Sequence, residues 1–228
     1  MKVIAHRGAS RIAVENTLEA FVQARRCGAD WIELDARRTA DDVIVVHHDP
    51  RVPDGRAIVE CTYADLPRYI PTLDAALAAC DPLGINVEIK NDPAEPDFDP
   101  FRVIAVTVLE HCRSRGERIL ISSFDLAVID RVIGLDAMPS TAWLTEEFTW
   151  ETLETLLAHG HRVLHPSHRT VTIEMIEAAH RLGVSVNTWT VDDPDRMSDL
   201  IAMGIDGICT NVPDVLVGLL ASMPADGG

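Results

Sequence analysis

Two hydrophobic patterns alternate along the chain. Short runs rich in β-branched and other apolar residues are followed by longer stretches in which apolar residues recur every three or four positions. The short runs are typical of buried strands and the longer stretches of amphipathic helices, so the alternation predicts βαβ units and a parallel sheet. The predicted strands are Lys2–His6, Trp31–Asp35, Val43–His47, Ile85–Ile89, Ile119–Ser122, Ser140–Trp143, Val163–His165, Val184–Thr188 and Gly207–Thr210.

Signals for helix ends support the boundaries of the helical stretches. Asn16 with Glu19 three positions later matches a capping box at the start of the first helix. Gly28, Gly183 and Gly204 each follow a helical stretch, at the position where a left-handed C-terminal cap is favoured. The predicted helices are Asn16–Cys27, Thr72–Cys80, Pro100–Ser114, Asp125–Ile133, Trp150–His159, Thr172–Leu182, Pro194–Met203 and Pro213–Leu220.

These elements predict an α/β protein with the architecture of a (β/α)₈ TIM barrel. No linker or compositional break divides the 228 residues, so we expect one domain over residues 1–228. Nine strand-like runs are predicted, whereas the barrel has eight strands. Because no helix separates Val43–His47 from the strand before it, this run is either a short extra strand or an extension of its neighbour. The active site of such a barrel lies at the carboxyl ends of its strands.

Composition and charge exclude several classes of partner. The chain carries 20 basic and 36 acidic residues, a formal net charge of −16, which repels nucleic acid and anionic membranes. A small anionic substrate would need a local positive charge, which a bound metal could provide. The sequence contains neither a membrane-spanning apolar run nor a signal-peptide pattern, which favours a cytoplasmic protein without stable membrane association. Five widely spaced cysteines suggest neither disulfides nor a thiolate metal site, and nothing indicates the oligomeric state.

Acidic side chains gather at the ends of two neighbouring barrel strands. Glu33 and Asp35 share one face of their strand, and Glu88 ends the next barrel strand. Carboxylates that point into a barrel lose hydration and repel one another, at a cost of several kcal/mol per ion unless something pairs with them. Three carboxylates form an all-oxygen site that suits Mg²⁺, Ca²⁺ or Mn²⁺ better than Zn²⁺. The competing interpretation is that basic residues satisfy these acids as structural ion pairs. The candidate partners are Arg7, Arg37 and Lys90.

Two of the nine histidines lie beside this acidic group. His6 and His48 stand at predicted strand ends, where a pair of imidazoles could act as the acid and base of a phosphoryl transfer. A metal-ligand role is the main competing functional interpretation, and a plain core histidine is the third. Most other histidines lie on or just after predicted helices, where a solvated or half-buried role is expected. They include His111, His159, His161 and His180.

A series of short motifs runs through the chain in a fixed order. The first half contains Ala5-His6-Arg7-Gly8-Ala9, Glu15–Phe21, Gly28–Asp30, Ile32–Asp35 and Val45–Asp49. The second half contains Pro71–Leu73, Val87–Lys90, Ser122–Phe124, Asn187–Val191 and Gly204–Pro213. Each motif alone is a weak signal, but the ordered series covers residues 3–214 and is specific. On these residues the chain resembles the glycerophosphodiester phosphodiesterase family.

The resemblance implies a (β/α)₈ barrel enzyme that hydrolyses glycerophosphodiesters to an alcohol and glycerol 3-phosphate. It implies one divalent cation, Mg²⁺ or Ca²⁺ with Mn²⁺ as a further candidate, held by the positions that match Glu33, Asp35 and Glu88. A catalytic histidine pair matches His6 and His48. The positions implied for substrate binding are Arg7, Lys90 and Trp189.

The family likeness also implies a role for each of these side chains. Arg7 would contact the phosphate, Lys90 would add a second positive group, and Trp189 would line the pocket, although core packing explains an aromatic residue there equally well. One histidine would remove a proton from the nucleophile and the other would protonate the leaving alcohol. We assign His6 as the base and His48 as the acid. The reverse assignment stays open, as does the choice between water and a neighbouring glycerol hydroxyl as nucleophile.

One segment departs from the family pattern. Family members carry a longer insertion after the His-Asp motif, whereas here a short reduced insertion, Pro50–Ile70, separates Asp49 from Pro71. We therefore expect a reduced cap over the pocket and little selection of the leaving alcohol.

Two other classes of function remain as alternatives. A lysophospholipase D-like barrel would need an apolar groove and a membrane-facing surface, which the acidic balance disfavours. A non-catalytic barrel that binds phosphorylated ligands is disfavoured because both histidines and all three carboxylates are present.

Overall fold

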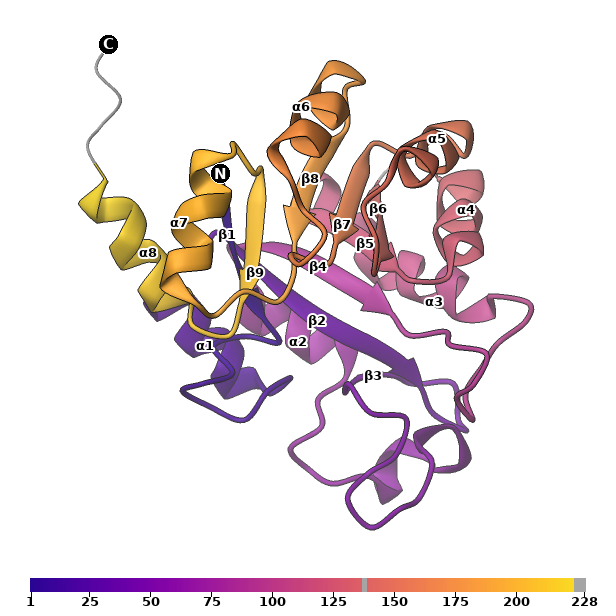
Figure 1. Ribbon diagram of the computed structural model, residues 1–228. Helices are drawn as coiled ribbons and strands as arrows, with labels where there is room; N and C mark the ends of the chain where they lie inside the picture. The colour runs from indigo at the N-terminus through magenta and orange to yellow at the C-terminus, as the bar shows by residue number, and fades with distance from the viewer. Residues whose placement is uncertain (137–138, 224–228) are drawn as a thin grey trace.

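The computed structural model is a closed barrel of eight parallel strands surrounded by helices (Figure 1). It describes residues 1–136 and 139–223. The strand order is β1-β9-β8-β7-β6-β5-β4-β2, and pairing of β1 with β2 closes the ring. The predicted (β/α)₈ architecture is therefore confirmed. The barrel strands are β1 (Lys2–His6), β2 (Trp31–Arg38), β4 (Gly84–Ile89), β5 (Ile119–Ser123), β6 (Ser140–Thr145), β7 (Val163–Pro166), β8 (Ser185–Thr188) and β9 (Gly207–Thr210).

Helices cover the outside of the barrel between successive strands (Figure 1). Several begin at a threonine whose hydroxyl accepts a hydrogen bond from the first turn, as at Thr72, Thr149 and Thr172. Within the described part of the chain, no helix is long and apolar enough to cross a membrane. The helices are α1 (Leu18–Arg26), α2 (Leu73–Cys80), α3 (Val103–Cys112), α4 (Leu126–Leu135), α5 (Trp150–Ala158), α6 (Ile173–Arg181), α7 (Pro194–Ala202) and α8 (Pro213–Ser222), with 3₁₀ helices η1 (Ile58–Glu60), η2 (Tyr63–Asp65) and η3 (Arg113–Arg118).

The extra strand-like run forms a ninth strand outside the barrel. This strand, β3 (Ile44–Val46), pairs antiparallel with the last three residues of β2, Ala36–Arg38. The first of the two interpretations of Val43–His47 is thus confirmed. Because β2 continues past the barrel rim to pair with β3, the chain leaves β3 close to the carboxyl ends of the barrel strands. His47 and His48 follow directly.

The predicted capping box at the first helix is wrong, whereas the predicted glycine caps are confirmed. Thr17 caps α1, and its hydroxyl accepts from the backbone N–H of Ala20. Asn16 takes a left-handed conformation with φ 56°, and its buried side chain turns toward the barrel instead. At the other helix ends, the three glycines predicted as caps have φ of 84°, 72° and 84°. They are Gly28, Gly183 and Gly204.

Strand β2 shows how the barrel separates its core from its site. Ile32 and Leu34 are fully buried in the main hydrophobic cluster, and Glu33 and Asp35 alternate with them on the opposite face. Apolar residues therefore anchor the strand to the helices, while the inward positions near its carboxyl end carry charge. This arrangement holds the polar side chains on a rigid frame.

Residues 50–70 form a small unit with its own core beside β3, in the lower part of Figure 1. A turn lies at Pro53–Gly55, where Gly55 has φ 91° and its N–H donates to the Val52 carbonyl at 2.8 Å. Two short 3₁₀ helices, η1 and η2, lie in this unit. Its hydrophobic cluster joins Val45 of β3 to Val52, Ile58, Cys61, Leu66 and Ile70.

Candidate active site

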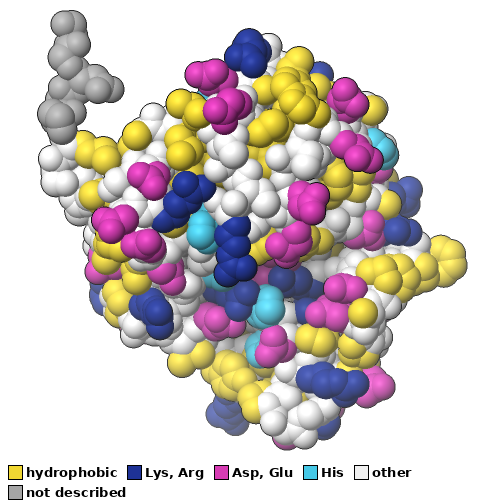
Figure 2. Space-filling model, in the orientation of Figure 1, with side chains coloured by type: hydrophobic (Ala, Val, Ile, Leu, Met, Phe, Trp, Pro, Cys, Tyr) yellow, Lys and Arg dark blue, Asp and Glu magenta, His cyan; other side chains and the backbone are white. Residues whose placement is uncertain are grey.

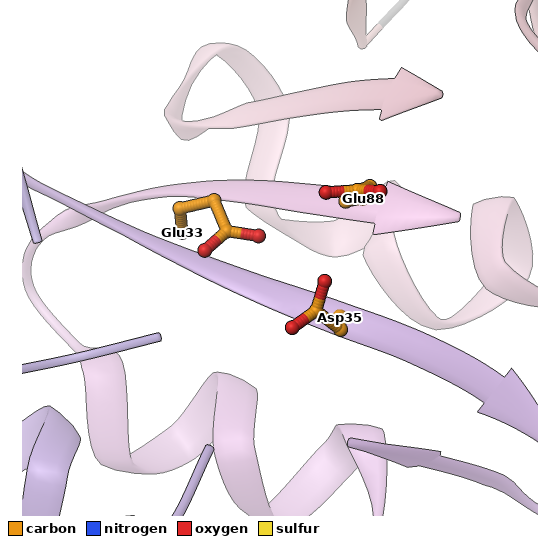
Figure 3. A group of neighbouring side chains, drawn as sticks. All are labelled: Glu33, Asp35 and Glu88. Atoms are coloured by element: carbon orange, nitrogen blue, oxygen red, sulfur yellow. The ribbon is translucent and has the colours of Figure 1, made fainter. Parts of the chain in front are cut away.

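Three carboxylates meet inside the barrel near the carboxyl ends of β2 and β4 (Figure 3). Glu33, Asp35 and Glu88 each offer an oxygen, and these oxygens all lie within 4.8 Å of one another. The three residues are buried, with exposed fractions of 4%, 0% and 8%. The register of the two strands places Asp35 directly beside Glu88. The structure therefore brings together all three acids that the sequence singled out.

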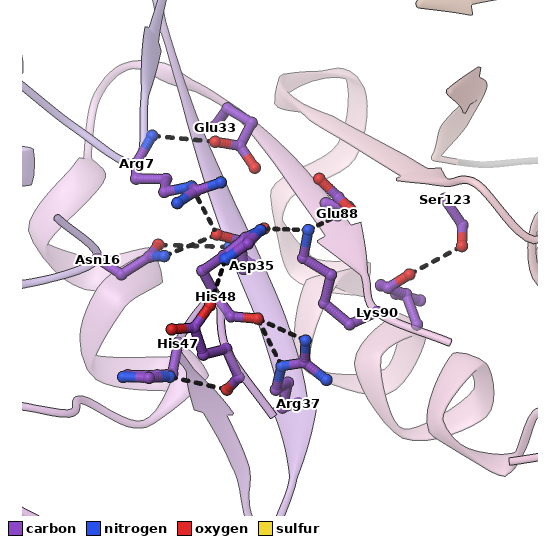
Figure 4. A network of polar contacts seen from close by, with 12 residues as sticks. Arg7, Asn16, Glu33, Asp35, Arg37, His47, His48, Glu88, Lys90 and Ser123 are labelled. Carbon is purple, nitrogen blue, oxygen red and sulfur yellow. Dashed lines mark hydrogen bonds and ion pairs between the residues drawn. The ribbon is translucent and has the colours of Figure 1, made fainter. Parts of the chain in front are cut away.

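Two cations neutralise part of this buried charge (Figure 4). Lys90 Nζ lies 2.6 Å from Glu88 Oε1 and 3.0 Å from Asp35 Oδ1, and Arg7 Nε lies 3.2 Å from Asp35 Oδ2. Burial favours loss of the lysine proton, but the charges of Glu88 and Asp35 outweigh it and raise the pKa of Lys90. With all three acids ionised, one negative charge remains in excess. Structural ion pairing thus accounts for part of the cluster but not for all of it.

Glu33 has the least compensation of the three acids. Its Oε2 accepts the backbone N–H of Arg7 at 2.9 Å, while its buried Oε1 has no hydrogen-bond partner within the described residues. Burial raises the pKa of Glu33 well above its ordinary value, and the charges of Asp35 and Glu88 raise it further. For Asp35, burial is outweighed by Lys90 and Arg7, which hold its pKa below the ordinary value. An orphaned carboxylate oxygen in an all-oxygen group fits a hard divalent cation.

The turn after β1 directs Arg7 toward the acids. Arg7 and Gly8 both have positive φ, 56° and 83°, so the backbone reverses immediately after the strand. A Cβ at Gly8 would lie 2.6 Å from the backbone of Ala20, which leaves glycine as the residue that fits this turn. The Arg7 guanidinium reaches Asp35 and also Glu15 Oε1, at 2.9 Å. Its place between the barrel interior and solvent suits a group that contacts an anionic substrate.

His6 ends β1 beside the carboxylates. Its Nε2 lies 4.0 Å from Glu33 Oε2, and its Nδ1 lies 2.7 Å from the side-chain oxygen of Asn211. Burial lowers the pKa of His6, and the nearby charge of Arg7 lowers it further. The imidazole is therefore neutral at neutral pH and presents Nε2 to the cluster.

His48, and not His47, faces the acidic cluster (Figure 4). Its Nδ1 lies 2.8 Å from Asp49 Oδ1, and the ring interacts electrostatically with Lys90 and Asp35. Burial and then Lys90 lower the pKa of His48, with Asp35 and Asp49 opposing them. His47 turns away and bonds to the main-chain oxygen of Asp49 at 2.9 Å.

A cavity of about 530 Å³ opens beside Lys90 and His48. Figure 2 shows basic, acidic and histidine side chains gathered in a hollow on this face of the molecule. Trp189 is not among the described residues that line the cavity. Its ring instead packs edge-to-face against Phe124, with centroids 5.5 Å apart, and its Nε1 donates to the His165 carbonyl. The other lining residues include Glu88, Asn91, Asp92, Pro93, Glu95, Phe98, Arg102, Phe124, Asp125 and Leu126.

Comparison with known proteins gives one consistent family. Residues 6–215 match the model of the glycerophosphoryl diester phosphodiesterase family. The chain belongs to this family. It is 30% identical to the probable glycerophosphodiester phosphodiesterase 2 of Mycobacterium tuberculosis, over 95% of this chain and 89% of the relative. It is also 30% identical to the glycerophosphodiester phosphodiesterase of Caldanaerobacter subterraneus, over 96% and 97% of the two chains. The family is one of hydrolases, so the chain is grouped with phosphodiester-cleaving enzymes.

Solved structures show the same architecture. The glycerophosphodiester phosphodiesterase of Thermotoga maritima superposes with a TM-score of 0.83 at 28% identity, covering 96% of this chain and 98% of that one. A phosphodiesterase of Oleispira antarctica, solved with the product sn-glycerol-3-phosphate, superposes with a TM-score of 0.89 at 22% identity, covering 97% of each chain. The barrel of this chain is therefore the barrel of the phosphodiesterase family.

Two residues of this phosphodiesterase have positions that the sequence analysis missed. Asn16, interpreted as a helix cap, is buried and donates from Nδ2 to Asp35 Oδ2 at 2.7 Å. Arg37, weighed as a counter-ion of the cluster, instead donates to Glu95 at 2.8 Å and to Asp97 at 2.6 Å. Its Nε donates to the main-chain oxygen of His48 at 2.8 Å, so it ties the β4–α3 loop to the segment that carries His48. In the sequence, Arg37 shares strand parity with Glu33 and Asp35, which suggests a place in the cluster. Parity does not reveal its contacts with the β4–α3 loop.

We expect Arg37→Ala to lower the free energy of unfolding by about 3–5 kcal/mol, as when one partner of a buried ion pair is removed. The arginine side chain is 1% exposed, and Asp97 would keep an uncompensated buried charge. Urea denaturation would measure the loss. Arg181→Ala is the matched control, since Arg181 is exposed and pairs with the exposed Glu177; its cost should be below about 1 kcal/mol. Equal costs for the two variants would contradict the structural role of Arg37.

Proposed function

We propose that the chain is a metal-dependent phosphodiesterase that hydrolyses glycerophosphodiesters to an alcohol and glycerol 3-phosphate. One observation carries the proposal: a buried carboxylate cluster with an orphaned oxygen lies between two cations and two histidines at the mouth of the barrel. The names of the curated relatives and the product bound in the Oleispira structure support the choice of substrate. We propose further that residues 1–228 act as a single domain on this small-molecule substrate.

Glu33, Asp35 and Glu88 would hold one divalent cation. Their ligand set is entirely oxygen, which favours Mg²⁺ or Ca²⁺, with Mn²⁺ as a further candidate. When bound, the ion would supply Lewis-acid polarisation of a phosphoryl oxygen. Arg7 and Lys90, which already stand at the edge of the cluster, would bind phosphate oxygens and share the charge that develops during the reaction.

The surroundings of the two histidines favour one assignment of base and acid. The Nδ1 of His6 bonds to the amide oxygen of Asn211, so this nitrogen carries the proton and Nε2 keeps a lone pair for accepting one. The Nδ1 of His48 bonds to the carboxylate of Asp49, which stabilises an imidazolium. We therefore propose His6 as the base that activates water or a neighbouring glycerol hydroxyl. His48 would protonate the leaving alcohol.

Trp189 takes a modified role in this proposal. Because it packs against Phe124, which lines the cavity, it would shape the apolar wall through that ring rather than by lining the cavity itself. Phe124 is the residue that would meet the carbon atoms of the substrate.

A direct assay tests the proposed function. Purified protein is incubated with glycerophosphocholine after chelator treatment, and then with added Mg²⁺ or Ca²⁺. We expect glycerol 3-phosphate and choline to form when a metal is present and almost no product in its absence. A chain that releases nothing with either ion, or Mn²⁺, would overturn the proposal and favour a barrel that only binds phosphorylated ligands.

We expect weak selection of the leaving alcohol. Most of the charged side chains that line the cavity form internal pairs: Lys90 pairs with Glu88, Arg102 with Asp125, and Glu95 with a buried arginine. A wrong alcohol would therefore leave none of these groups unpaired, and unpaired groups are what penalise a wrong substrate. Glycerophosphocholine, glycerophosphoethanolamine and glycerophosphoglycerol should differ in kcat/KM by less than roughly tenfold, about 1.4 kcal/mol.

A substrate panel measures this spread. A thousandfold preference for one headgroup would contradict the argument from paired side chains. Activity confined to long-chain lysolipids would favour the lysophospholipase D-like alternative. A human lysophospholipase D is 37% identical to this chain, but the match covers only 33% of this chain and 25% of the human protein.

A further inference from the structure

Behind His6, a chain of hydrogen bonds continues through Asn211 to Asp192. Asn211, which follows β9, accepts from Ser10 Oγ at 2.8 Å and contacts His6 Nδ1 at 2.7 Å through the same oxygen. Its Nδ2 donates to Asp192 Oδ2 at 2.8 Å. Asp192 lies between β8 and α7, so three loops at the mouth of the barrel meet at one amide.

The carboxylate of Asp192 fixes which way the Asn211 amide points. A carboxylate can only accept hydrogen bonds, so the NH₂ group of Asn211 must face Asp192 and the oxygen must face His6. Asp192 is itself held by three neutral donors, the two N–H groups of Asn211 and the hydroxyl of Thr210 at 3.1 Å. Within the described residues it forms no ion pair. Its Oδ1 holds the main chain of Asn211 and the Thr210 hydroxyl, and its Oδ2 orients the Asn211 amide.

We propose that Asp192 and Asn211 are positioning residues that set the tautomer of His6, so that Nδ1 carries the proton and Nε2 faces the reaction centre with a lone pair. This inference rests on the proposed base role of His6. An amide oxygen orients the ring without contributing a full negative charge, in contrast to the carboxylate behind His48. The two histidines would thus be prepared for opposite proton transfers by the groups behind them.

Asp192→Asn is the decisive substitution. The main-chain N–H of Asn211 cannot turn away, so the remaining side-chain oxygen at position 192 should stay on it. The new NH₂ group then faces the NH₂ of Asn211, and the Asn211 amide must flip. His6 would lose its acceptor at Nδ1 and move its proton to Nε2. We expect kcat to fall about a hundredfold, within the range for a lost general base, while KM changes less than about threefold.

A polarity swap provides the rescue. In the double variant Asp192→Asn with Asn211→Asp, the NH₂ group at 192 donates to a carboxylate at 211, and that carboxylate again accepts from His6 Nδ1. The net charge is unchanged. We expect the kcat of the double variant to be at least tenfold higher than that of Asp192→Asn. A merely structural loss would not be reversed in this way. Asp193→Asn is the matched control, because Asp193 caps α7 and asparagine caps a helix equally well. It should behave as the parent protein.

The tautomer itself is read by nitrogen NMR. Two-bond ¹H–¹⁵N correlations of ring-labelled protein, recorded with Mg²⁺ at about pH 8 where imidazole is neutral, distinguish protonation at Nδ1 from protonation at Nε2. We expect Nδ1–H for His6 in the parent, the Asp193 control and the double variant, and Nε2–H in Asp192→Asn. An unchanged His6 tautomer in Asp192→Asn would overturn the inference. If His6→Ala keeps full activity while these tautomers follow expectation, the proposed base role fails and the positioning network stands.

Discussion

His6→Ala and His48→Ala are each expected to reduce turnover by at least roughly a hundredfold with the fold intact. His6 presents Nε2 toward Glu33, and His48 lines the cavity next to Lys90. Their side chains are 19% and 35% exposed, and neither belongs to the hydrophobic clusters, so truncation leaves the apolar core intact. Steady-state kinetics on glycerophosphocholine would measure the loss, and circular dichroism would verify the fold.

Position 47 supplies the control for this pair. His47→Ala should change turnover by less than about threefold, because the ring bonds to the main chain of Asp49 away from the carboxylates. A large loss at His47 with a small loss at His48 would mean that the wrong member of the pair faces the substrate.

The leaving group distinguishes acid from base. An alcohol that departs as a stable anion, such as p-nitrophenol, needs no protonation, so a glycerophosphodiester of p-nitrophenol should restore most of the activity of His48→Ala. The same substrate should not rescue His6→Ala, because the nucleophile still requires a base. Rescue of His6→Ala instead would reverse the assignment.

The sequence predicted the acidic cluster because strand geometry is local and regular. Side chains two positions apart on a strand share a face, and parallel strands end at one rim. Knowing that Glu33 and Asp35 share a face with apolar neighbours between them was therefore enough to direct both into the barrel. The register then set Glu88 beside Asp35.

The misses have a common physical cause, which is that their partners lie far away in the chain. Asn16 matched a local capping pattern, but a buried carboxylate 19 positions away gives its amide a better partner. Arg37 has the parity of a cluster residue, yet it extends past the barrel to acids some 60 positions away on the β4–α3 loop. Periodicity carries no information about which distant loop folds back over a strand end.

The roles of the paired histidines show the same limit. Sequence placed His6 and His48 at strand ends but left base and acid open. The proposed assignment rests on the group behind each ring, an adjacent carboxylate at Asp49 and an amide 205 positions away at Asn211. Asp49 is visible in the sequence as part of the His-Asp motif. Asn211 is brought next to His6 only when the barrel closes.

Removal of divalent metal is expected to abolish turnover and to lower the melting temperature. A ligand present at a hundred times its Kd stabilises the folded state by about 2.7 kcal/mol. For a chain of this size that corresponds to a shift of roughly 5–10 °C. Differential scanning calorimetry with chelator and with Mg²⁺ or Ca²⁺ would measure it. If turnover and melting temperature are unchanged after chelation, the prediction that Glu33, Asp35 and Glu88 bind a metal ion is wrong.

The metal-dependent shift in melting temperature should grow as the pH rises above the ordinary glutamate pKa of 4.5. The folded-state pKa of Glu33 lies above its ordinary value of 4.5, so its contribution to stability is complete below that value and is lost as pH rises through the folded pKa. A cation binds the ionised carboxylate and offsets this loss, so metal and protons compete. Asp35 does not contribute in this window, because its lowered pKa places its titration below the ordinary value of 3.8.

Glu33→Gln is the matched variant for this pH dependence. Glutamine keeps an oxygen for the backbone N–H of Arg7 and removes the least compensated charge of the cluster. At about pH 8 the metal-free variant should melt at a higher temperature than the metal-free parent, since it no longer holds an uncompensated buried carboxylate. It should also gain little from Mg²⁺ and lose nearly all turnover. If the variant is instead less stable than the metal-free parent and still responds to Mg²⁺, Glu33 is a structural acid and the ion is held elsewhere.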